Sequence, residues 1–242
     1  MKLDEKPMKI PLIIAHRGGS SVARENTIAA FEEAIALQAD LIELDVRFTQ
    51  DSVLIIHHDA AIHQQPIEAL TWAEVQHLDS DVPTLEEAIA CCKGRIGLDV
   101  EIKEPGYEAE VVQQLQHHLS GHEFVITSFY LGVIRAVKES SSLEVSIGFL
   151  MDHQTLLDLE EEEFLGQYLQ AMGVDFVAPN WQIVDSPVLS KIIPAQMPFW
   201  VWTVNDVEMM QKLLGNKRVK AIVTDQPSLG LQLRADSTDS TS

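Results

Sequence analysis

Two histidines, His16 and His58, each follow an apolar run typical of a buried strand. Imidazole titrates near neutral pH, so such a pair is suited to carrying protons during a reaction. A lone histidine is usually structural, but acids occur in two further runs of the same kind, Glu43 and Asp45 in one and Glu101 in the other. Polar groups at the ends of core strands are costly unless something binds there. We therefore expect one composite site.

The three acids are suited to holding a metal ion. Glu43 and Asp45 are two positions apart on one expected strand, so their side chains point to the same face. Carboxylates on one buried face repel each other unless a cation neutralises them. Together with Glu101 from a neighbouring strand they form an oxygen-rich site suited to Mg²⁺ or Ca²⁺ rather than to zinc. The alternative is a wet strand end at which Glu43 and Asp45 pair with Arg47 or Lys103.

Arg17 and Lys103 place positive charge at the same strand ends. Lys103 lies two residues beyond Glu101, and hence on the same face of the strand. A salt bridge within the site is one interpretation. The other is an anion clamp for a phosphoryl group, in which the guanidinium contacts two oxygens and the ammonium acts as a point charge. Because the chain as a whole is strongly acidic, concentrated positive charge here favours the anion clamp.

The composition indicates one acidic globular protein. The chain has 242 residues, 46% of them hydrophobic, and a formal net charge of −20 from 17 basic and 37 acidic residues. Such acidity argues against nucleic acid or anionic lipid headgroups as general partners. No apolar run approaches the ~20 residues that a membrane span needs. The sequence gives no indication of the oligomeric state.

The expected compartment is the cytoplasm. The charged start, residues 1–7, is unlike a secretory signal. Cys91 and Cys92 are adjacent in an apolar helical stretch, so we expect two free thiols in a reducing environment rather than a disulfide.

Several other chemistries lack their sequence motifs. The chain has no Walker-type glycine-rich loop, no Cys/His metal spacing and no Gly-x-Ser-x-Gly. Nucleotide hydrolysis, zinc chemistry and serine esterase chemistry are therefore disfavoured. An aldolase or enolase type of barrel would need a lysine base or a Schiff-base lysine on a strand, and Lys103 alone supports that alternative.

The pattern of elements predicts how these residues are brought together. Strands alternate with helices along most of the chain, which favours a parallel sheet. The expected strands are 10–15, 41–49, 53–58, 96–103, 123–128, 145–150, 174–179, 198–204 and 219–224. The expected helices are 27–37, 84–92, 109–119, 131–139, 154–172 and 207–214.

One pair of strands must be antiparallel, because the few residues around Gln50 and Asp51 are too few for a parallel crossover. A two-residue turn would bring His58 opposite Glu43, whereas a three-residue turn would bring His57 opposite Asp45. Either register folds this arm back onto the acidic strand.

Without the returning arm, eight strands remain. They predict a (β/α)8 barrel, with an open doubly wound sheet as the alternative. We expect a single domain over residues 1–234, a short hairpin or lid insertion after the second strand at about 47–83, and a disordered tail at 235–242.

An ordered set of short motifs resembles the glycerophosphodiester phosphodiesterase family over about residues 13–227. Each motif is weak alone, but the set in this order is specific. The motifs are Ala15-His16-Arg17-Gly18-Gly19, Glu25-Asn26-Thr27, Ile42-Glu43-Leu44-Asp45-Val46, His58-Asp59, Pro83-Thr84-Leu85-Glu86-Glu87, Val100-Glu101-Ile102-Lys103, Ser128-Phe129, Trp202-Thr203-Val204-Asn205 and Thr224-Asp225.

The resemblance implies a TIM barrel that hydrolyses glycerophosphodiesters, small molecules derived from phospholipids, to sn-glycerol 3-phosphate and an alcohol. It implies that His16 and His58 form the acid/base pair, and it favours His58 over His57. It also implies metal ligation by an acidic triad and phosphate contacts by two cations. The triad is Glu43, Asp45 and Glu101, and the cations are Arg17 and Lys103.

Two departures from the family pattern bear on substrate choice. The segment between His58 and Pro83 is shorter than usual, so the lid over the site is reduced, and Arg24 replaces the usual proline before Glu-Asn-Thr. A lysophospholipase D-like activity on substrates with one acyl chain is therefore an alternative. A non-catalytic barrel that binds a phosphodiester is disfavoured, because all seven site residues are present.

Overall fold

Eight parallel strands close into a barrel in this computed structural model, which describes residues 11–19, 23–141, 144–159 and 165–239. The ring closes because β1 pairs in parallel with both β2 and β11. The predicted barrel is therefore confirmed, and the open sheet is wrong. In order around the ring the strands are β1 (Leu12–Ala15), β2 (Leu41–Phe48), β6 (Gly97–Ile102), β7 (Phe124–Ser128), β8 (Ser146–Met151), β9 (Phe176–Pro179), β10 (Phe199–Val201) and β11 (Val219–Thr224).

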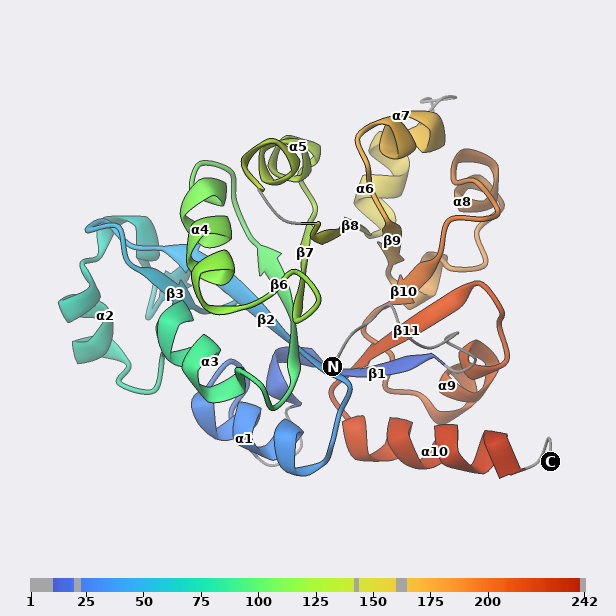
Figure 1. Ribbon diagram of the computed structural model, residues 1–242, viewed down its shortest axis with the longest axis horizontal. Coiled ribbons are helices and arrows are strands. Elements are labelled where there is room, and N and C mark those ends of the chain that lie inside the picture. The colour runs from blue at the N-terminus through green and yellow to red at the C-terminus, as the bar shows by residue number, and fades with distance from the viewer. Residues whose placement is uncertain (1–10, 20–22, 142–143, 160–164, 240–242) are drawn as a thin grey trace.

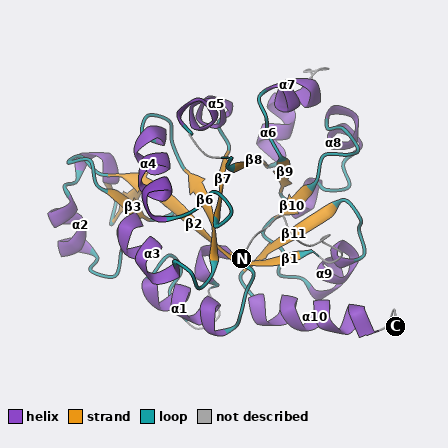
Figure 2. Cartoon of the chain, viewed as in Figure 1, coloured by secondary structure: helices purple, strands orange, loops and turns teal. Residues whose placement is uncertain are grey.

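Helices surround the ring of strands (Figures 1 and 2). They are α1 (Ile28–Ala36), α3 (Leu85–Cys92), α4 (Glu108–His118), α5 (Leu131–Ser140), α6 (His153–Asp158), α7 (Leu165–Ala171), α8 (Pro187–Ile192), α9 (Val207–Leu214) and α10 (Pro227–Asp239). Within the described residues, no helix combines the length and the apolar character that crossing a membrane requires.

Two of the sequence expectations about helices need correction. The single helix expected at 154–172 is divided into α6 and α7, and residues 160–164 between them lie outside the described residues. The expected disordered tail is wrong for residues 235–239, which continue α10, whereas residues 240–242 lie outside the described residues. Helix α10 packs along the outside of β1 (Figure 1). Arg234 in this helix forms an ion pair with Asp40, which directly precedes β2.

Strand alternation divides the apolar residues into two layers. Ile13 and Ala15 on β1 face outward to the helices, and Leu12 and Ile14 face the barrel interior. The interior layer is small, and Phe176 and Trp200 fill much of it, with stacked rings whose centroids are 4.1 Å apart. The interior becomes polar at the carboxyl ends of β2, β6 and β7, which is the usual location of the active site in such barrels.

A separate insertion follows β2 and contains a small core of its own. It comprises β3 (Leu54–Ile56), the hairpin of β4 (Ala61–Ile62) and β5 (Gln65–Pro66), the 3₁₀ turn Ile67–Ala69 and α2 (Trp72–Leu78). Its core consists of Ile55, Ile62, Ile67, Leu70, Val75 and Val82. The predicted short insertion thus forms regular secondary structure with its own small apolar core, beside the barrel mouth.

The register of the hairpin is the one expected for a three-residue turn. Val46 pairs with Ile56, so His57 lies opposite Asp45 and its backbone N–H donates to the Asp45 carbonyl over 2.9 Å. The Thr49 hydroxyl accepts from the Val53 N–H over 2.9 Å and thereby closes the turn. The two-residue alternative is wrong.

Packing of β7 against the outer helices should contribute strongly to stability. Replacing the fully buried Phe124 with alanine is expected to lower the free energy of unfolding by about 3–5 kcal/mol, because it removes a ring and leaves a cavity. Leu157→Ala is the matched control, since that side chain is 50% exposed and its loss should change stability by about 0.5 kcal/mol or less. Urea unfolding followed by circular dichroism would measure both, and equal effects would contradict the assigned packing.

Candidate active site

The three predicted metal ligands meet at the mouth of the barrel. Asp45 on β2 and Glu101 on β6 are direct neighbours in the parallel register, and Glu43 lies two residues before Asp45 on the same face. Each offers a carboxylate oxygen, and these oxygens all lie within 4.8 Å of one another. All three residues are buried. The register of two adjacent strands is therefore sufficient to assemble the triad.

The backbone after β1 takes a tight turn that brings His16 and Arg17 to the triad. Arg17 has a φ of 52°, in the left-handed region, and its N–H donates to Glu43 Oε2 over 2.9 Å. Gly18 has a φ of 90°, and a Cβ there would lie 2.7 Å from the Ala30 side chain. Glycine is thus required both by the conformation and by the close approach of α1.

The two cationic side chains contact the acids directly. Lys103 Nζ lies 2.7 Å from Glu101 Oε1 and 3.1 Å from Asp45 Oδ1. Arg17 Nε lies 3.2 Å from Asp45 Oδ2, an ion-pair contact without hydrogen-bond geometry, and its Nη1 donates to Glu25 Oε1 over 2.8 Å. The predicted salt bridges involving Lys103 are therefore present, while Arg47 pairs with Glu104 rather than with the triad.

Burial changes the pKa values of the three acids of the triad. Desolvation, reinforced by Asp45 and Glu101, raises the pKa of Glu43 well above its usual value. Desolvation and the Asp45 charge raise the pKa of Glu101 to about 7. Desolvation also acts on Asp45, but Lys103 and Arg17 outweigh it and hold that pKa at about 2. Three carboxylates face two cationic side chains, so a bound cation would relieve the remaining repulsion.

These residues fit a hard divalent cation. The donor atoms are all carboxylate oxygens, which Mg²⁺ and Ca²⁺ prefer, and three donors leave coordination positions for water or a substrate oxygen. The cation-binding alternative and the salt-bridge alternative are not exclusive, because Lys103 contacts one oxygen of each of two acids.

His16 and His58 both line the cavity above the triad. His16 Nδ1 lies 2.6 Å from Asp225 Oδ1, and its Nε2 lies 3.9 Å from Glu43 Oε2. His58 Nδ1 lies 2.8 Å from Asp59 Oδ1. Burial lowers the pKa of His58, although the charge of Asp45 opposes this effect. Each imidazole is thus oriented through Nδ1 by a carboxylate.

His57 is not part of the cavity lining, although the hairpin register places its backbone opposite Asp45. Strand β3 ends at Ile56, so the alternation of side chains does not continue to residues 57 and 58. His57 Nδ1 lies 2.9 Å from the Asp59 carbonyl instead. Of the two histidines, the one favoured by the family resemblance, His58, is the one that lines the cavity.

Several site residues were not assigned from the sequence. Asp225 also contacts Asn205, whose Nδ2 donates to Asp225 Oδ2 over 2.6 Å. This contact follows from the closed sheet, in which Ala15 and Thr224 are paired and their successors, His16 and Asp225, are therefore neighbours. Asn26, which belongs to one of the motifs of the family resemblance, donates from Nδ2 to Asp45 Oδ2 over 2.8 Å.

Asp99 is a further unassigned acid on the inner face of β6. It lies two residues before Glu101, lines the same cavity and accepts a hydrogen bond of 2.9 Å from the Thr127 hydroxyl. Burial raises the pKa of its carboxyl to about 7. The Arg24 side chain, by contrast, does not face the cavity but forms an ion pair of 2.9 Å with Asp79 near α2.

The cavity has two chemically different walls. Its volume is about 130 Å³, and the charged groups come from β2, from β6 and from the segments that directly follow β1, β3 and β6. The opposite wall is apolar and comprises Phe129, Leu150, Ala178, Trp200, Trp202 and Val223. The Trp202 Nε1 donates to the Ala178 carbonyl over 2.6 Å, and the Phe129 ring meets Trp202 edge to face at 5.6 Å.

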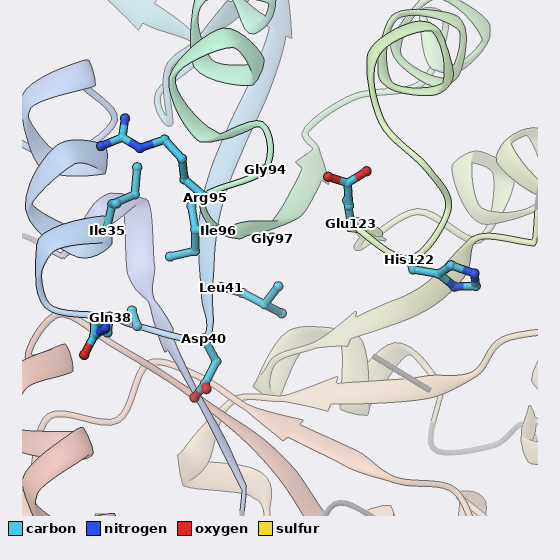
Figure 3. A pocket seen from close by; sticks show the side chains of 11 residues that line it. Ile35, Gln38, Asp40, Leu41, Gly94, Arg95, Ile96, Gly97, His122 and Glu123 are labelled. Atoms are coloured by element: carbon cyan, nitrogen blue, oxygen red, sulfur yellow. The ribbon is translucent and has the colours of Figure 1, made fainter. Parts of the chain in front are cut away.

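A second pocket, of about 330 Å³, lies at the opposite end of the barrel (Figure 3). Leu41 and Gly97 in its lining mark the amino ends of β2 and β6. Two of its charged residues are paired elsewhere, Asp40 with Arg234 and Arg95 with Glu32. It contains none of the predicted catalytic residues, so the candidate active site is the smaller cavity at the carboxyl ends.

Comparison with known proteins shows similar sequences and similar barrels. A glycerophosphodiester phosphodiesterase from Caldanaerobacter subterraneus is 28% identical over 244 residues, covering 92% of this chain and 97% of the relative. A crystal structure of a glycerophosphodiester phosphodiesterase from Thermotoga maritima has a TM-score of 0.79 at 24% identity and covers 93% of this chain and 98% of its own.

A third similar protein carries a bound product. The structure of a phosphodiesterase from Oleispira antarctica, solved with sn-glycerol-3-phosphate, has a TM-score of 0.78 at 23% identity and covers 93% of this chain and 96% of its own. The family model described as the Glycerophosphoryl diester phosphodiesterase family matches residues 16–229, a range that begins at His16 and includes every predicted site residue. The chain therefore belongs to the glycerophosphoryl diester phosphodiesterase family and is an enzyme of that type.

Proposed function

We propose that this enzyme hydrolyses glycerophosphodiesters to sn-glycerol 3-phosphate and an alcohol by metal-dependent, two-histidine catalysis. The observation that carries the proposal is the convergence of the acidic triad, two cations and two imidazoles on one cavity. The Oleispira antarctica phosphodiesterase, whose structure contains sn-glycerol-3-phosphate, supports the choice of product class.

The charged wall would bind and orient the phosphodiester. Glu43, Asp45 and Glu101 would hold a Mg²⁺ or Ca²⁺ ion, which supplies Lewis-acid neutralisation of developing negative charge when bound. Arg17 and Lys103 would then contact the phosphate oxygens, since both reach the same carboxylates from the cavity side. Stabilisation of this electrostatic kind is usually the largest contribution to catalysis.

The two histidines would carry the protons. One imidazole removes the proton from the nucleophile, and the other protonates the leaving alkoxide, so that the phosphorus–oxygen bond to the alcohol breaks without releasing a free alkoxide. The nucleophile is either water or the adjacent glycerol hydroxyl, which would first form a cyclic phosphate. The carboxylates at Nδ1 leave Nε2 of each ring as the atom that exchanges the proton.

A lysophospholipase D-like activity is the second candidate. The apolar wall that includes Phe129, Leu150 and Trp202 favours it, because an acyl chain or another apolar group needs such a surface. Release of phosphate monoester from glycerophosphocholine and from lysophosphatidylcholine should be compared directly. Faster turnover of glycerophosphocholine supports the first candidate, and faster turnover of lysophosphatidylcholine supports the second.

We also propose that the enzyme works in a reducing compartment, with the cytoplasm as the expected location. Cys91 and Cys92 are both free thiols, and burial raises the pKa of the Cys92 thiol further above neutrality. Neither thiol is therefore poised for redox chemistry.

Removal of divalent cations should abolish turnover. We expect EDTA to reduce hydrolysis of glycerophosphocholine to background, and Mg²⁺ or Ca²⁺ to restore it, because without a metal ion the carboxylates repel the anionic phosphodiester and only Arg17 and Lys103 oppose this repulsion. Glu101→Gln should weaken this reactivation, whereas Glu86→Gln, on the exposed face of α3, should not. Full turnover in EDTA after exhaustive dialysis would refute metal dependence.

Both histidines should be required for turnover but not for metal binding. His16→Ala and His58→Ala are each expected to lower kcat by about 10²–10⁴-fold, the usual contribution of a positioned acid or base. His57→Ala is the matched control and should keep kcat near that of the parent enzyme. The histidine assignment fails if either variant binds metal normally and retains kcat within about threefold.

Asp225 should act through His16 as a positioning residue. Asp225→Asn keeps the shape of the side chain but removes the charge that orients the imidazole, so we expect kcat to fall by about tenfold or more with little change in KM. An unchanged kcat would show that the contact has no catalytic consequence.

A further inference from the structure

A buried arginine outside the proposed catalytic set contacts the backbone of His58. Arg47 lies two residues beyond Asp45 on β2 and is buried at the barrel mouth. Its Nε donates to the His58 carbonyl over 2.8 Å, and its Nη2 donates to the same oxygen. Both donors of one edge of the guanidinium are thus used on a single carbonyl of the loop that carries the catalytic imidazole.

Glu104 neutralises Arg47 and links it to the neighbouring strand. Arg47 Nη1 forms an ion pair with the Glu104 carboxylate, and Glu104 directly follows Lys103. The other oxygen of Glu104, Oε2, lies 2.7 Å from the Tyr107 hydroxyl, which in turn lies 2.8 Å from the Val46 carbonyl. The contacts fix the guanidinium from both sides, so it is not available to bind a substrate anion.

The His58 loop needs such an anchor. Strand β3 ends at Ile56, and the last described backbone contact of this arm with β2 is the 2.9 Å hydrogen bond from the His57 N–H to the Asp45 carbonyl, one residue before His58. Its imidazole is held through Asp59, which belongs to the same loop and has an exposed side chain, so that contact does not fix the loop relative to the barrel. The contact with Arg47 extends this link with β2, the strand that carries Glu43 and Asp45, to His58 itself.

We propose that Arg47, held by Glu104, is a positioning residue that fixes His58 relative to the acidic triad. The inference rests on the proposed role of His58 in catalysis and goes beyond it by naming the residue through which β2 sets the position of the imidazole. A flexible loop would spread the imidazole over several orientations, which lowers kcat more than it changes KM.

A double-mutant cycle tests this proposal. Arg47→Met, His58→Ala and the double variant are compared with the parent enzyme by kcat and KM for glycerophosphocholine. Arg47→Met should lower kcat by about tenfold or more with KM within about threefold, and it should lower kcat by a clearly smaller factor in the His58→Ala background. The proposal is overturned if Arg47→Met leaves kcat unchanged, or if the factor is as large without the imidazole.

Arg218→Met is the matched control for a purely structural effect. Arg218 also donates to backbone carbonyls, those of Met197 and Pro194, but it precedes β11 at the opposite end of the barrel. Arg218→Met should lower the midpoint of thermal unfolding and leave kcat of the folded enzyme unchanged. An equal loss of kcat in both arginine variants would show that the effect is one of stability and would overturn the proposal.

Three further outcomes separate the role of Arg47 from that of His58 and from loss of folding. If Arg47→Met does not fold, Arg47→Lys takes its place in the same cycle, because lysine keeps the charge beside Glu104 but loses the two-donor contact with the carbonyl. If His58→Ala itself retains parent turnover, the proposed function of His58 fails. If His58→Ala loses turnover and the cycle is additive, only the role of Arg47 fails.

Discussion

The concentration of buried carboxylates at one end of a closed barrel is the constraint on which the site depends. Glu43, Asp45 and Glu101 lie on adjacent parallel strands, and the register of these strands places their carboxylate oxygens within 4.8 Å of one another. Moving three acids out of water is unfavourable unless cations compensate them. Arg17 and Lys103 compensate part of the charge, and a divalent ion completes the compensation in our account.

The same constraint explains why so many polar contacts surround the triad. The Asn26 side chain and the Arg17 N–H donate hydrogen bonds to carboxylates of the triad. Both residues have a positive φ, a backbone conformation that non-glycine residues rarely adopt. Gly18 allows α1 to approach closely enough for this arrangement. Local strain in the β1–α1 loop is thus balanced by charge-assisted hydrogen bonds to the acids.

Much of the architecture could be predicted because each element obeys a simple periodicity. The strands carrying Glu43, Asp45 and Glu101 were recognisable as apolar runs, and the triad follows from the two-residue spacing and the parallel register. The end of α6 at Asp158 was missed because the expected helical pattern of residues 154–172 continues past this position without a strong local stop signal. Helix α10 was not among the expected helices, and its residues past Arg234 form a short polar stretch without apolar periodicity.

The parts of the site that could not be predicted are those that depend on tertiary pairing. The choice between His57 and His58 depends on where β3 ends, which the apolar run does not define to a single residue. Asp225 becomes a partner of His16 only because the barrel closes and pairs β1 with β11. Arg47 and Glu104 are 57 positions apart and meet only because β2 and β6 are neighbours. Such contacts are properties of the closed ring rather than of any segment.

Anomalous diffraction from crystals soaked in Mn²⁺, an oxygen-preferring substitute for Mg²⁺, tests the central claim most directly. Our account predicts a single strong peak at coordination distance from carboxylate oxygens of Glu43, Asp45 and Glu101, within the cavity that His16 and His58 line. A map with no peak at the triad, or with the ion bound elsewhere while these acids keep their contacts with Lys103 and Arg17, would contradict it.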